Sequence, residues 1–267
     1  MGAQIDKVKV AQSFSRAAAT YDSAAGLQKA VGKELLKRLD AVDGLLPQVM
    51  DLGCGTGYFS QALAERFGVD QLLCLDIAEG MLQHARNEAA LDDASWLCAD
   101  AESLPLKNDS LGLVFSSLAL QWCENTTLLF SEIGRVLRPG GVACISTLGP
   151  KSLWELREAW QHVDEHVHVN RFIPVEDLCQ ALPQELVVES CETQLRILQY
   201  SKLRTLTDEL KKIGAHNMNA GEAKGLTGRE KVQQFKANYE RFRSECGSLP
   251  ASYEVYYLVL RKRDDAA

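Results

Sequence analysis

Residues 51–57 read Asp-Leu-Gly-Cys-Gly-Thr-Gly (DLGCGTG), with three glycines at alternate positions. The stretch directly follows the apolar run at 48–52 and directly precedes a segment with helical spacing of apolar residues. Gly53, Gly55 and Gly57 allow a sharp turn and let a ligand approach without meeting a Cβ atom. The first turn of a helix adds free N–H donors. The sequence therefore predicts a ligand-binding loop between a β-strand and a helix.

Strands and helices alternate on both sides of this loop. One or two helices are predicted within residues 4–40, and further apolar strand-like runs occupy 71–76, 95–100, 111–118 and 141–148. Helical segments separate these runs. Five strands that alternate with helices predict a mostly parallel sheet with right-handed crossovers. The expected fold class is therefore α/β, Rossmann-like and doubly wound.

The alternation loosens after residue 150. Strand-like runs lie at 186–197 and 253–262, and helical segments at 151–163, 203–213 and 229–243. We expect the late helices to form a cap over the carboxyl edge of a seven-stranded sheet whose last strand is antiparallel. The helix before the fifth strand is predicted to end ahead of Pro139. The expected organisation is one domain over 1–267, with an N-terminal helical lid at 1–44, a ligand-binding core at 45–150, a cap and substrate region with one strand at 151–250, and the final strand and tail at 251–267.

Acidic residues stand where three consecutive strands end. Asp51 opens the loop, Asp76 ends the second strand, and Asp100 ends the third. The glycine spacing is G-x-G-x-G, whereas the loop that grips a pyrophosphate has G-x-G-x-x-G. An acid about 20 residues beyond the loop accepts ribose hydroxyls, and one at the third strand can accept the amine of adenine. These acids predict a cationic nucleoside ligand without phosphates, and S-adenosylmethionine is such a ligand.

Each of these features also has a simpler structural explanation. A G-x-G-x-G stretch occurs in ordinary turns, and a lone aspartate after a strand is often a helix N-cap. We favour the ligand-binding interpretation because the loop and the acids stay in register with the alternating strands and helices. A non-catalytic protein that binds S-adenosylmethionine remains an alternative.

The chain resembles class I S-adenosylmethionine-dependent methyltransferases at DLGCGTG (51–57), LDIAEGML (75–82), CADAESLPL (98–106) and RVLRPGG (135–141). Further segments resemble the malonyl-[acyl-carrier-protein] O-methyltransferases of biotin synthesis, and the similarity extends over nearly the whole chain. The match is less clear at 222–250. The further segments are FSRAAATYDSAAGLQ (14–28), SLALQWCEN (117–125), LREAWQHVDEHVHVNRFIP (156–174) and LKKIGAHN (210–217).

This resemblance implies methyl transfer from S-adenosylmethionine to the free carboxylate of a malonyl thioester, giving the methyl ester that primes pimeloyl synthesis for biotin. It also implies that Tyr21 and Phe172 lie in a lid over the active site. The residues it assigns to the cofactor are Asp51, Gly53, Gly55, Asp76, Ile77, Met81, Asp100, Ala101, Glu102 and Leu118, and we add Cys54, Gly57 and Ser117 from the same motifs.

The expected chemistry requires no general base, because the malonyl carboxylate is already ionised near pH 7. Positioning alone can supply about 7–11 kcal/mol of such a barrier. Candidates for contact with the carboxylate are Arg16, Gln121, Trp122 and Arg171. Gln121 and Trp122 could instead line the cofactor, and Arg16 could be a surface charge. Another small acceptor, such as a quinone precursor or a different carboxylic acid, is the alternative substrate.

Composition narrows the class of protein. Apolar residues make up 46% and charged residues 24% of 267 residues, which is typical of a globular protein. No run of about 18 apolar residues or apolar leader is present, and the eight cysteines form no CxxC pair, so we expect a cytoplasmic protein without structural zinc. The net charge of −7 argues against nucleic acid. His162, His166 and His168 lie close together in the sequence, and two histidines at i, i+4 spacing can bind a metal on a helix. No clear third ligand accompanies such a pair, so no metal is predicted.

One segment is net basic, although the chain as a whole is net acidic. From residue 196 to residue 236 there are nine Lys or Arg against four Asp or Glu. Acyl carrier proteins, which the family resemblance brings in as partners, are acidic. We therefore expect a carrier protein to dock here, although the segment could be a solvated helix face. Malonyl-coenzyme A is the alternative form of the substrate. The predicted docking residues are Lys202, Arg204, Lys211 and Lys212.

Overall fold

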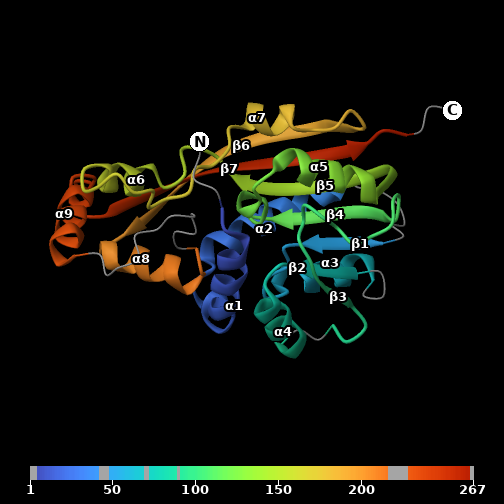
Figure 1. Ribbon diagram of the computed structural model, residues 1–267, viewed down its shortest axis with the longest axis horizontal. Helices are drawn as coiled ribbons and strands as arrows, with labels where there is room; N and C mark the ends of the chain where they lie inside the picture. The colour runs from blue at the N-terminus through green and yellow to red at the C-terminus, as the bar shows by residue number, and fades with distance from the viewer. Residues whose placement is uncertain (1–4, 42–47, 69–71, 89–90, 216–227, 265–267) are drawn as a thin grey trace.

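The computed structural model describes residues 5–41, 48–68, 72–88, 91–215 and 228–264. One seven-stranded sheet in the order β3-β2-β1-β4-β5-β7-β6 carries helices on both faces (Figure 1). β1 to β5 run parallel, and β7 lies antiparallel between β5 and β6. The predicted fold class is therefore confirmed. The strands are β1 (Val49–Leu52), β2 (Leu72–Asp76), β3 (Ser95–Cys98), β4 (Leu111–Ser117), β5 (Leu137–Leu148), β6 (Leu186–Tyr200) and β7 (Leu249–Lys262).

Several helices gather at the carboxyl ends of the parallel strands. α1, α6, α8 and α9 lie beyond these ends in Figure 1, where the sequence predicts a lid and a cap. α1 packs against both α4 and α8, and α6 packs against α9. The helices are α1 (Lys7–Ala24), α2 (Gly26–Arg38), α3 (Tyr58–Phe67), α4 (Glu79–Glu88), α5 (Thr126–Val136), α6 (Trp154–Gln161), α7 (Val175–Gln180), α8 (Leu203–Lys212) and α9 (Arg229–Glu240).

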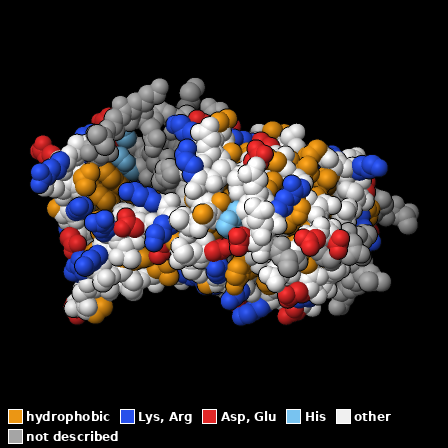
Figure 2. Space-filling model, turned by 90° about the horizontal axis from the view of Figure 1, so that it is seen from below, with side chains coloured by type: hydrophobic (Ala, Val, Ile, Leu, Met, Phe, Trp, Pro, Cys, Tyr) orange, Lys and Arg blue, Asp and Glu red, His pale blue; other side chains and the backbone are white. Residues whose placement is uncertain are grey.

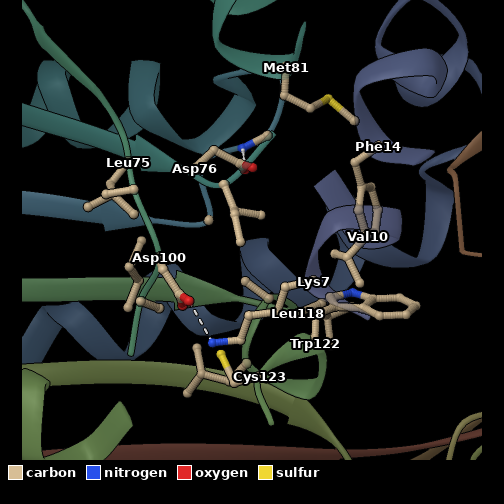
Figure 3. A pocket seen from close by; sticks show the side chains of 18 of the residues that line it. Lys7, Val10, Phe14, Leu75, Asp76, Met81, Asp100, Leu118, Trp122 and Cys123 are labelled. Carbon is tan, nitrogen blue, oxygen red and sulfur yellow. Dashed lines mark hydrogen bonds and ion pairs between the residues drawn. The ribbon is translucent and has the colours of Figure 1, made fainter. Parts of the chain in front are cut away.

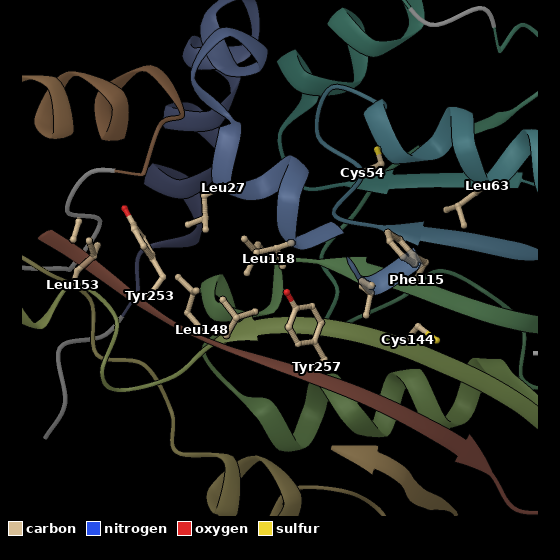
Figure 4. Packing of buried hydrophobic residues seen from close by; sticks show 14 of the residues in the cluster. Leu27, Cys54, Leu63, Phe115, Leu118, Cys144, Leu148, Leu153, Tyr253 and Tyr257 are labelled. Carbon is tan, nitrogen blue, oxygen red and sulfur yellow. The ribbon is translucent and has the colours of Figure 1, made fainter. Parts of the chain in front are cut away.

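The strands β1, β2 and β4 are buried over nearly their whole length because both faces of the sheet are covered. In β4, Leu113 and Phe115 point to one face and Val114 to the other. The first face packs against Leu27 of α2 and Leu63 of α3 (Figure 4). The second face packs against α5 and α7. The period of two along each strand thus places helices on both sides of the sheet.

The start of β5 differs from the sequence-based prediction. β5 begins at Leu137, four residues before the predicted start at residue 141, and α5 ends at Val136, ahead of Pro139 as predicted. Leu137 pairs with Leu111, and the register then shifts before Leu113 pairs with Val142. This irregular ladder accommodates Pro139, which has no N–H to donate. The strand therefore passes through a proline–glycine sequence that normally marks a boundary.

Some expectations concern residues outside the described part of the chain. The predicted boundary between lid and core, at residues 44 and 45, falls there, and so do His216 and Asn217 of the segment LKKIGAHN. Within the described ranges, no helix combines the length and apolar character needed to cross a membrane.

Candidate active site

The glycine loop between β1 and α3 has backbone angles that favour glycine. Gly53 has φ +76° and Gly55 has φ +55°. A Cβ atom on Gly53 would lie 2.3 Å from the Cβ of Ala119, whereas one on Gly55 would meet nothing within 4 Å. Packing therefore requires glycine at position 53. At position 55 the absence of a side chain leaves open space beside the loop, where a ligand can approach the backbone.

Asp76, at the end of β2, fixes this loop. Its Oδ2 atom accepts a hydrogen bond from Gly55 N at 2.9 Å, and its Oδ1 atom accepts one from Ala78 N at 2.8 Å. Burial raises the pKa of Asp76, although the backbone hydrogen bonds lower it. The hydrogen bond from Ala78 N resembles that of a helix N-cap, which was the simpler explanation considered for this aspartate. Asp76 combines that role with a place in the wall of a cavity.

This first cavity lies against the glycine loop and the ends of β1, β2 and β4 (Figure 3). Its walls are mostly apolar, with the carboxylates of Asp76 and Asp100 among them. An open loop backbone, two strand-end carboxylates and apolar walls fit S-adenosylmethionine. Nine of the thirteen residues predicted for the cofactor line the cavity: Gly53, Gly55, Asp76, Ile77, Met81, Asp100, Ala101, Ser117 and Leu118.

Asp51 lies behind the loop, and this corrects the expectation that it faces the ligand. It is 2% exposed, and its Oδ2 atom accepts a hydrogen bond of 2.6 Å from Ser60 Oγ. Burial raises the pKa of Asp51 to about 7, with a further increase from the charge of Asp76, while the bond from Ser60 lowers it. Cys54, Gly57 and Glu102 are likewise absent from the cavity wall.

Cys54 is unsuited to covalent chemistry. The residue is buried in the core cluster between the sheet and α2. Burial raises the pKa of its thiol well above the ordinary value, and the neighbouring carboxylates add to the effect. A thiolate is the reactive form of cysteine, so the raised pKa makes this thiol a poor nucleophile.

Lys7 is a site residue that the sequence analysis missed. Its Nζ atom lies 2.6 Å from Asp100 Oδ2 and 2.8 Å from Glu102 Oε2 (Figure 3). Burial lowers the pKa of Lys7, but the hydrogen bonds and charges of the two carboxylates outweigh this effect and raise it. The partners stand more than 90 positions apart, so no local pattern indicates the pairing.

Helix α1 forms one wall of the first cavity. Lys7, Val10, Phe14 and Tyr21 line it, and their spacing of three, four and seven residues places them on one helix face. The ring centroid of Phe14 lies 5.3 Å from that of Trp122. In Figure 3, Val10 and Phe14 of this helix stand across the cavity from Asp76 and Asp100. A ligand in the cavity would therefore be enclosed between α1 and the strand ends.

A second cavity of about 430 Å³ adjoins the first. The two cavities share Phe14, Tyr21, Leu118 and Trp122 in their walls. Tyr21, predicted as a lid residue, thus stands between them. Burial and the charges of Asp76 and Asp22 raise the pKa of Tyr21, so its hydroxyl stays protonated.

The candidates for contact with the acceptor separate into two groups. Gln121, Trp122 and the predicted lid residue Phe172 line the second cavity. Arg171 is exposed and lines a neighbouring cavity that Gln121 and Phe172 also border. Arg16 is exposed and lines none of these cavities, because two residues along a helix from Phe14 point to the opposite side. The structure therefore brings Gln121 and Trp122 to the second cavity, but not Arg16 or Arg171.

The cap side of the second cavity holds a polar cluster. The Nε2 atom of His168 lies 2.7 Å from Asp164 Oδ1, and Lys231 Nζ lies 3.0 Å from Asp164 Oδ2. Burial alone would raise the pKa of Asp164. The hydrogen bonds from His168 and Lys231 outweigh this effect and lower the pKa to about 2. Among the described residues there is no group of three or more ligands that could hold a metal ion.

The sheet with its antiparallel β7, the glycine loop and the acid at the end of β2 define the fold of class I S-adenosylmethionine-dependent methyltransferases. Residues 50–145 match the family model described as a methyltransferase domain. An S-adenosylmethionine-dependent methyltransferase of Mesorhizobium loti has a similar fold, with TM-score 0.51, 21% identity and coverage of 85% of this chain and 96% of that one. The [4+2]-cyclase SpnF shares the fold with TM-score 0.63 at 18% identity, covering 99% of this chain and 100% of that one.

The chain belongs to the malonyl-[acyl-carrier protein] O-methyltransferase family. A protein of that name from Methylovorus sp. is 45% identical over 267 residues, which cover 95% of this chain and 88% of the relative. The biotin biosynthesis bifunctional protein BioHC of Cellvibrio japonicus is 53% identical over 264 residues, which cover 97% of this chain and 51% of the relative. The chain thus spans about half the length of the bifunctional relatives it matches.

Proposed function

We propose that this chain methylates the free carboxylate of a malonyl thioester with S-adenosylmethionine as the methyl donor. The observation that supports this proposal is the meeting of two cavities at Tyr21, Leu118 and Trp122. One cavity suits the cofactor and the other is large enough for an acyl thioester. The names of the relatives indicate the acceptor, while a likeness of fold leaves the reaction open, because the cyclase SpnF shares it.

The chain offers a partner for each part of the cofactor. We assign the ribose hydroxyls to Asp76 and the adenine amine to Asp100, with the backbone of Gly55 beside them. When bound, S-adenosylmethionine supplies an electrophilic methyl group on a sulfonium. The proposed role of Phe14, Tyr21 and Trp122 is to direct that group toward the second cavity and to exclude water.

Catalysis then consists of positioning. The acceptor carboxylate is ionised at neutral pH, so no proton needs to be removed. Burial raises the pKa of Tyr21, so its hydroxyl keeps a proton that it can donate to the carboxylate. Gln121 donates a hydrogen bond from Nε2 to Leu118 O and accepts one at Oε1 from Thr147 Oγ1. Its side chain therefore forms a fixed part of the cavity wall. Aligning the carboxylate with the methyl group is the contribution we assign to these side chains.

A hydroxyl acceptor is the second candidate, and one observation favours it. The His168–Asp164 pair has the geometry of a histidine that acts as a general base with an orienting carboxylate. Such a base would be needed to ionise a hydroxyl group. It would give the chemical step a pH dependence that a carboxylate acceptor lacks.

The test is a single-turnover assay with radiolabelled S-adenosylmethionine. Malonyl-coenzyme A and malonyl-pantetheine should be methylated, whereas acetyl-coenzyme A, which has no free carboxylate, should not. The rate of the chemical step with malonyl-coenzyme A should be constant from about pH 6 to pH 8. A rate that rises with a midpoint near pH 7, or turnover of a phenolic acceptor in place of malonyl thioesters, would contradict the proposal.

The carrier protein is proposed to dock on the surface that includes α8. Lys202, Arg204, Lys211 and Lys212 are all exposed. In Figure 2, Lys and Arg side chains gather at the end of the molecule where α8 and α9 lie. Lys211 also lines the second cavity. An acidic carrier resting on this surface could therefore direct its acyl arm into the cavity.

A further inference from the structure

Three rings from the cap form a stacked column beside the second cavity. The ring centroids of Trp160 and His168 lie 3.8 Å apart with 12° between their planes. On the opposite face of Trp160, the ring centroid of Phe235 lies 4.2 Å from that of Trp160, with 11° between the two planes. Trp160 comes from α6, Phe235 comes from α9, and both Trp160 and His168 line the cavity.

His168 is held rigidly in this column. Its Nε2 atom bonds to Asp164, which stays ionised because Lys231 and His168 lower its pKa. The His168 side chain is 19% exposed. An ionised carboxylate accepts hydrogen bonds, so the proton lies on Nε2. Within the described residues the His168 ring makes this one hydrogen bond, which leaves Nδ1 for a ligand.

The column lies away from the end of the cavity where methyl transfer would occur. That end is formed by Tyr21, Leu118 and Trp122, which the first cavity shares. Trp160 and His168 belong to the cap, and α6 and α9 lie at one end of the molecule, beyond α1 (Figure 1). An acceptor with its carboxylate at the shared end would extend its other part toward the column.

We propose that His168 and Trp160 bind the amide-bearing arm of the acyl thioester, a pantetheine chain. The inference rests on the proposed function. A pantetheine arm alternates short apolar segments with amide groups. His168 and Phe235 cover the two faces of Trp160, so the edge of the indole that lines the cavity provides the apolar contact. Nδ1 of His168 provides one hydrogen bond to an amide. Asp164 is then a positioning residue that fixes the tautomer and orientation of the imidazole.

The test combines substrate truncation with substitution at position 168. Malonyl-pantetheine carries the full arm, and malonyl-N-acetylcysteamine ends after the first amide. For His168→Ala, KM for malonyl-pantetheine should rise about tenfold, because the hydrogen bond from the amide is lost and Trp160 loses the ring that holds it in place. KM for malonyl-N-acetylcysteamine should change less than about twofold, and kcat should be retained with both. His162→Gln, an exposed histidine in the same segment, is the matched control and should affect neither substrate.

Asp164→Asn provides a second variant that keeps His168 in place. It should raise KM for malonyl-pantetheine by a smaller factor, about threefold, and leave the short substrate unaffected. Equal effects on both substrates, or no effect on either, would overturn the assignment. A loss of kcat with both substrates would overturn it in favour of His168 as a base. Turnover of malonyl-N-acetylcysteamine by the wild-type protein tests the proposed function separately, since that substrate does not depend on the column.

Discussion

Gly55 and Asp76 are joined by a hydrogen bond of 2.9 Å from the backbone N–H of the loop to the Oδ2 atom of the carboxylate. The residue proposed to accept the ribose hydroxyls therefore also fixes the loop along which the ligand lies. Ligand binding and loop geometry share one carboxylate. A change at Asp76 should consequently affect cofactor affinity more than loss of a ligand contact alone.

The first prediction concerns Asp76→Ala. We expect S-adenosylmethionine to bind more weakly by about 1.5–3 kcal/mol, because hydrogen bonds to a charged acceptor are lost. Titration calorimetry on the folded variant would measure this. Asp92→Ala, which removes an exposed carboxylate near β3, is the control and should bind normally. Unchanged affinity in Asp76→Ala would show that Asp76 is only a structural cap.

The second prediction compares two glycines of the same loop. Gly53→Ala would place a Cβ atom 2.3 Å from the Cβ of Ala119, whereas Gly55→Ala meets no atom within 4 Å. Both keep a positive φ, which costs about 1–2 kcal/mol for alanine. Thermal unfolding without cofactor should therefore show a larger loss of stability for Gly53→Ala. Gly55→Ala should instead show its main defect in calorimetric cofactor affinity. Equal losses of stability would argue against the packing requirement at Gly53.

The sequence predicted the parts of this site that local patterns determine. The glycine loop and Asp76 follow from strand–turn–helix order, because the carboxyl ends of parallel strands meet at one edge. Lys7 and His168 could not be placed in this way. Each depends on contacts with side chains that tertiary packing brings near, such as Asp100 for Lys7 and Trp160 for His168. Sequence patterns likewise could not distinguish Arg171 from Gln121 as a contact for the acceptor, because only tertiary packing places Gln121 in the wall of the second cavity.

The third prediction concerns the buried carboxyl of Asp51. Its folded-state pKa is raised to about 7, above the ordinary value near 4. Between about pH 4 and pH 7 the folded state therefore binds more protons than the unfolded state, and the free energy of unfolding falls as pH rises. Asp51→Asn should remove this loss and gain stability relative to wild type at pH 8, by at most about 4 kcal/mol.

Urea unfolding of wild type and Asp51→Asn at pH 5 and pH 8, without cofactor, would measure this effect. Ser60→Ala removes the hydrogen bond that lowers the pKa of Asp51. It should therefore destabilise the protein more at pH 8 than at pH 5. A stability difference between Asp51→Asn and wild type that is the same at both pH values would contradict the assignment.

The fourth prediction concerns the ion pairs of Lys7 with Asp100 and Glu102. These contacts attach the start of α1 to the far wall of the first cavity. Lys7→Met should increase the dissociation rate of the cofactor about three- to tenfold, since a partly buried pair contributes about 1 kcal/mol. Stopped-flow measurement of Trp fluorescence would follow release. Lys33→Met, at an exposed position on α2, should release the cofactor at the wild-type rate. A wild-type rate of cofactor release in Lys7→Met would exclude a role for Lys7 in retaining the cofactor.

The last prediction tests carrier-protein docking. Lys211 lines the second cavity, so a change there could also affect small substrates. Arg204 and Lys212 are exposed and outside the cavity wall, which makes them the better pair for charge reversal. Arg204→Glu combined with Lys212→Glu should raise KM for a malonyl carrier protein several-fold. The increase should shrink as salt rises, because exposed charges are screened within about 8–10 Å at physiological ionic strength.

Two comparisons separate docking from other effects of this double variant. Activity with malonyl-pantetheine should remain at the wild-type level, since that substrate has no carrier body to dock. Lys33→Glu with Lys107→Glu makes the same change in net charge at exposed positions outside 196–236, and it should leave KM for the carrier substrate nearly unchanged. Because reversal at Arg204 also places a carboxylate near Asp208, its partner at 3.3 Å, Arg204→Ala serves as the milder variant. If both pairs of substitutions raise KM equally, the net charge of −7 controls encounter, and α8 is not a specific docking surface.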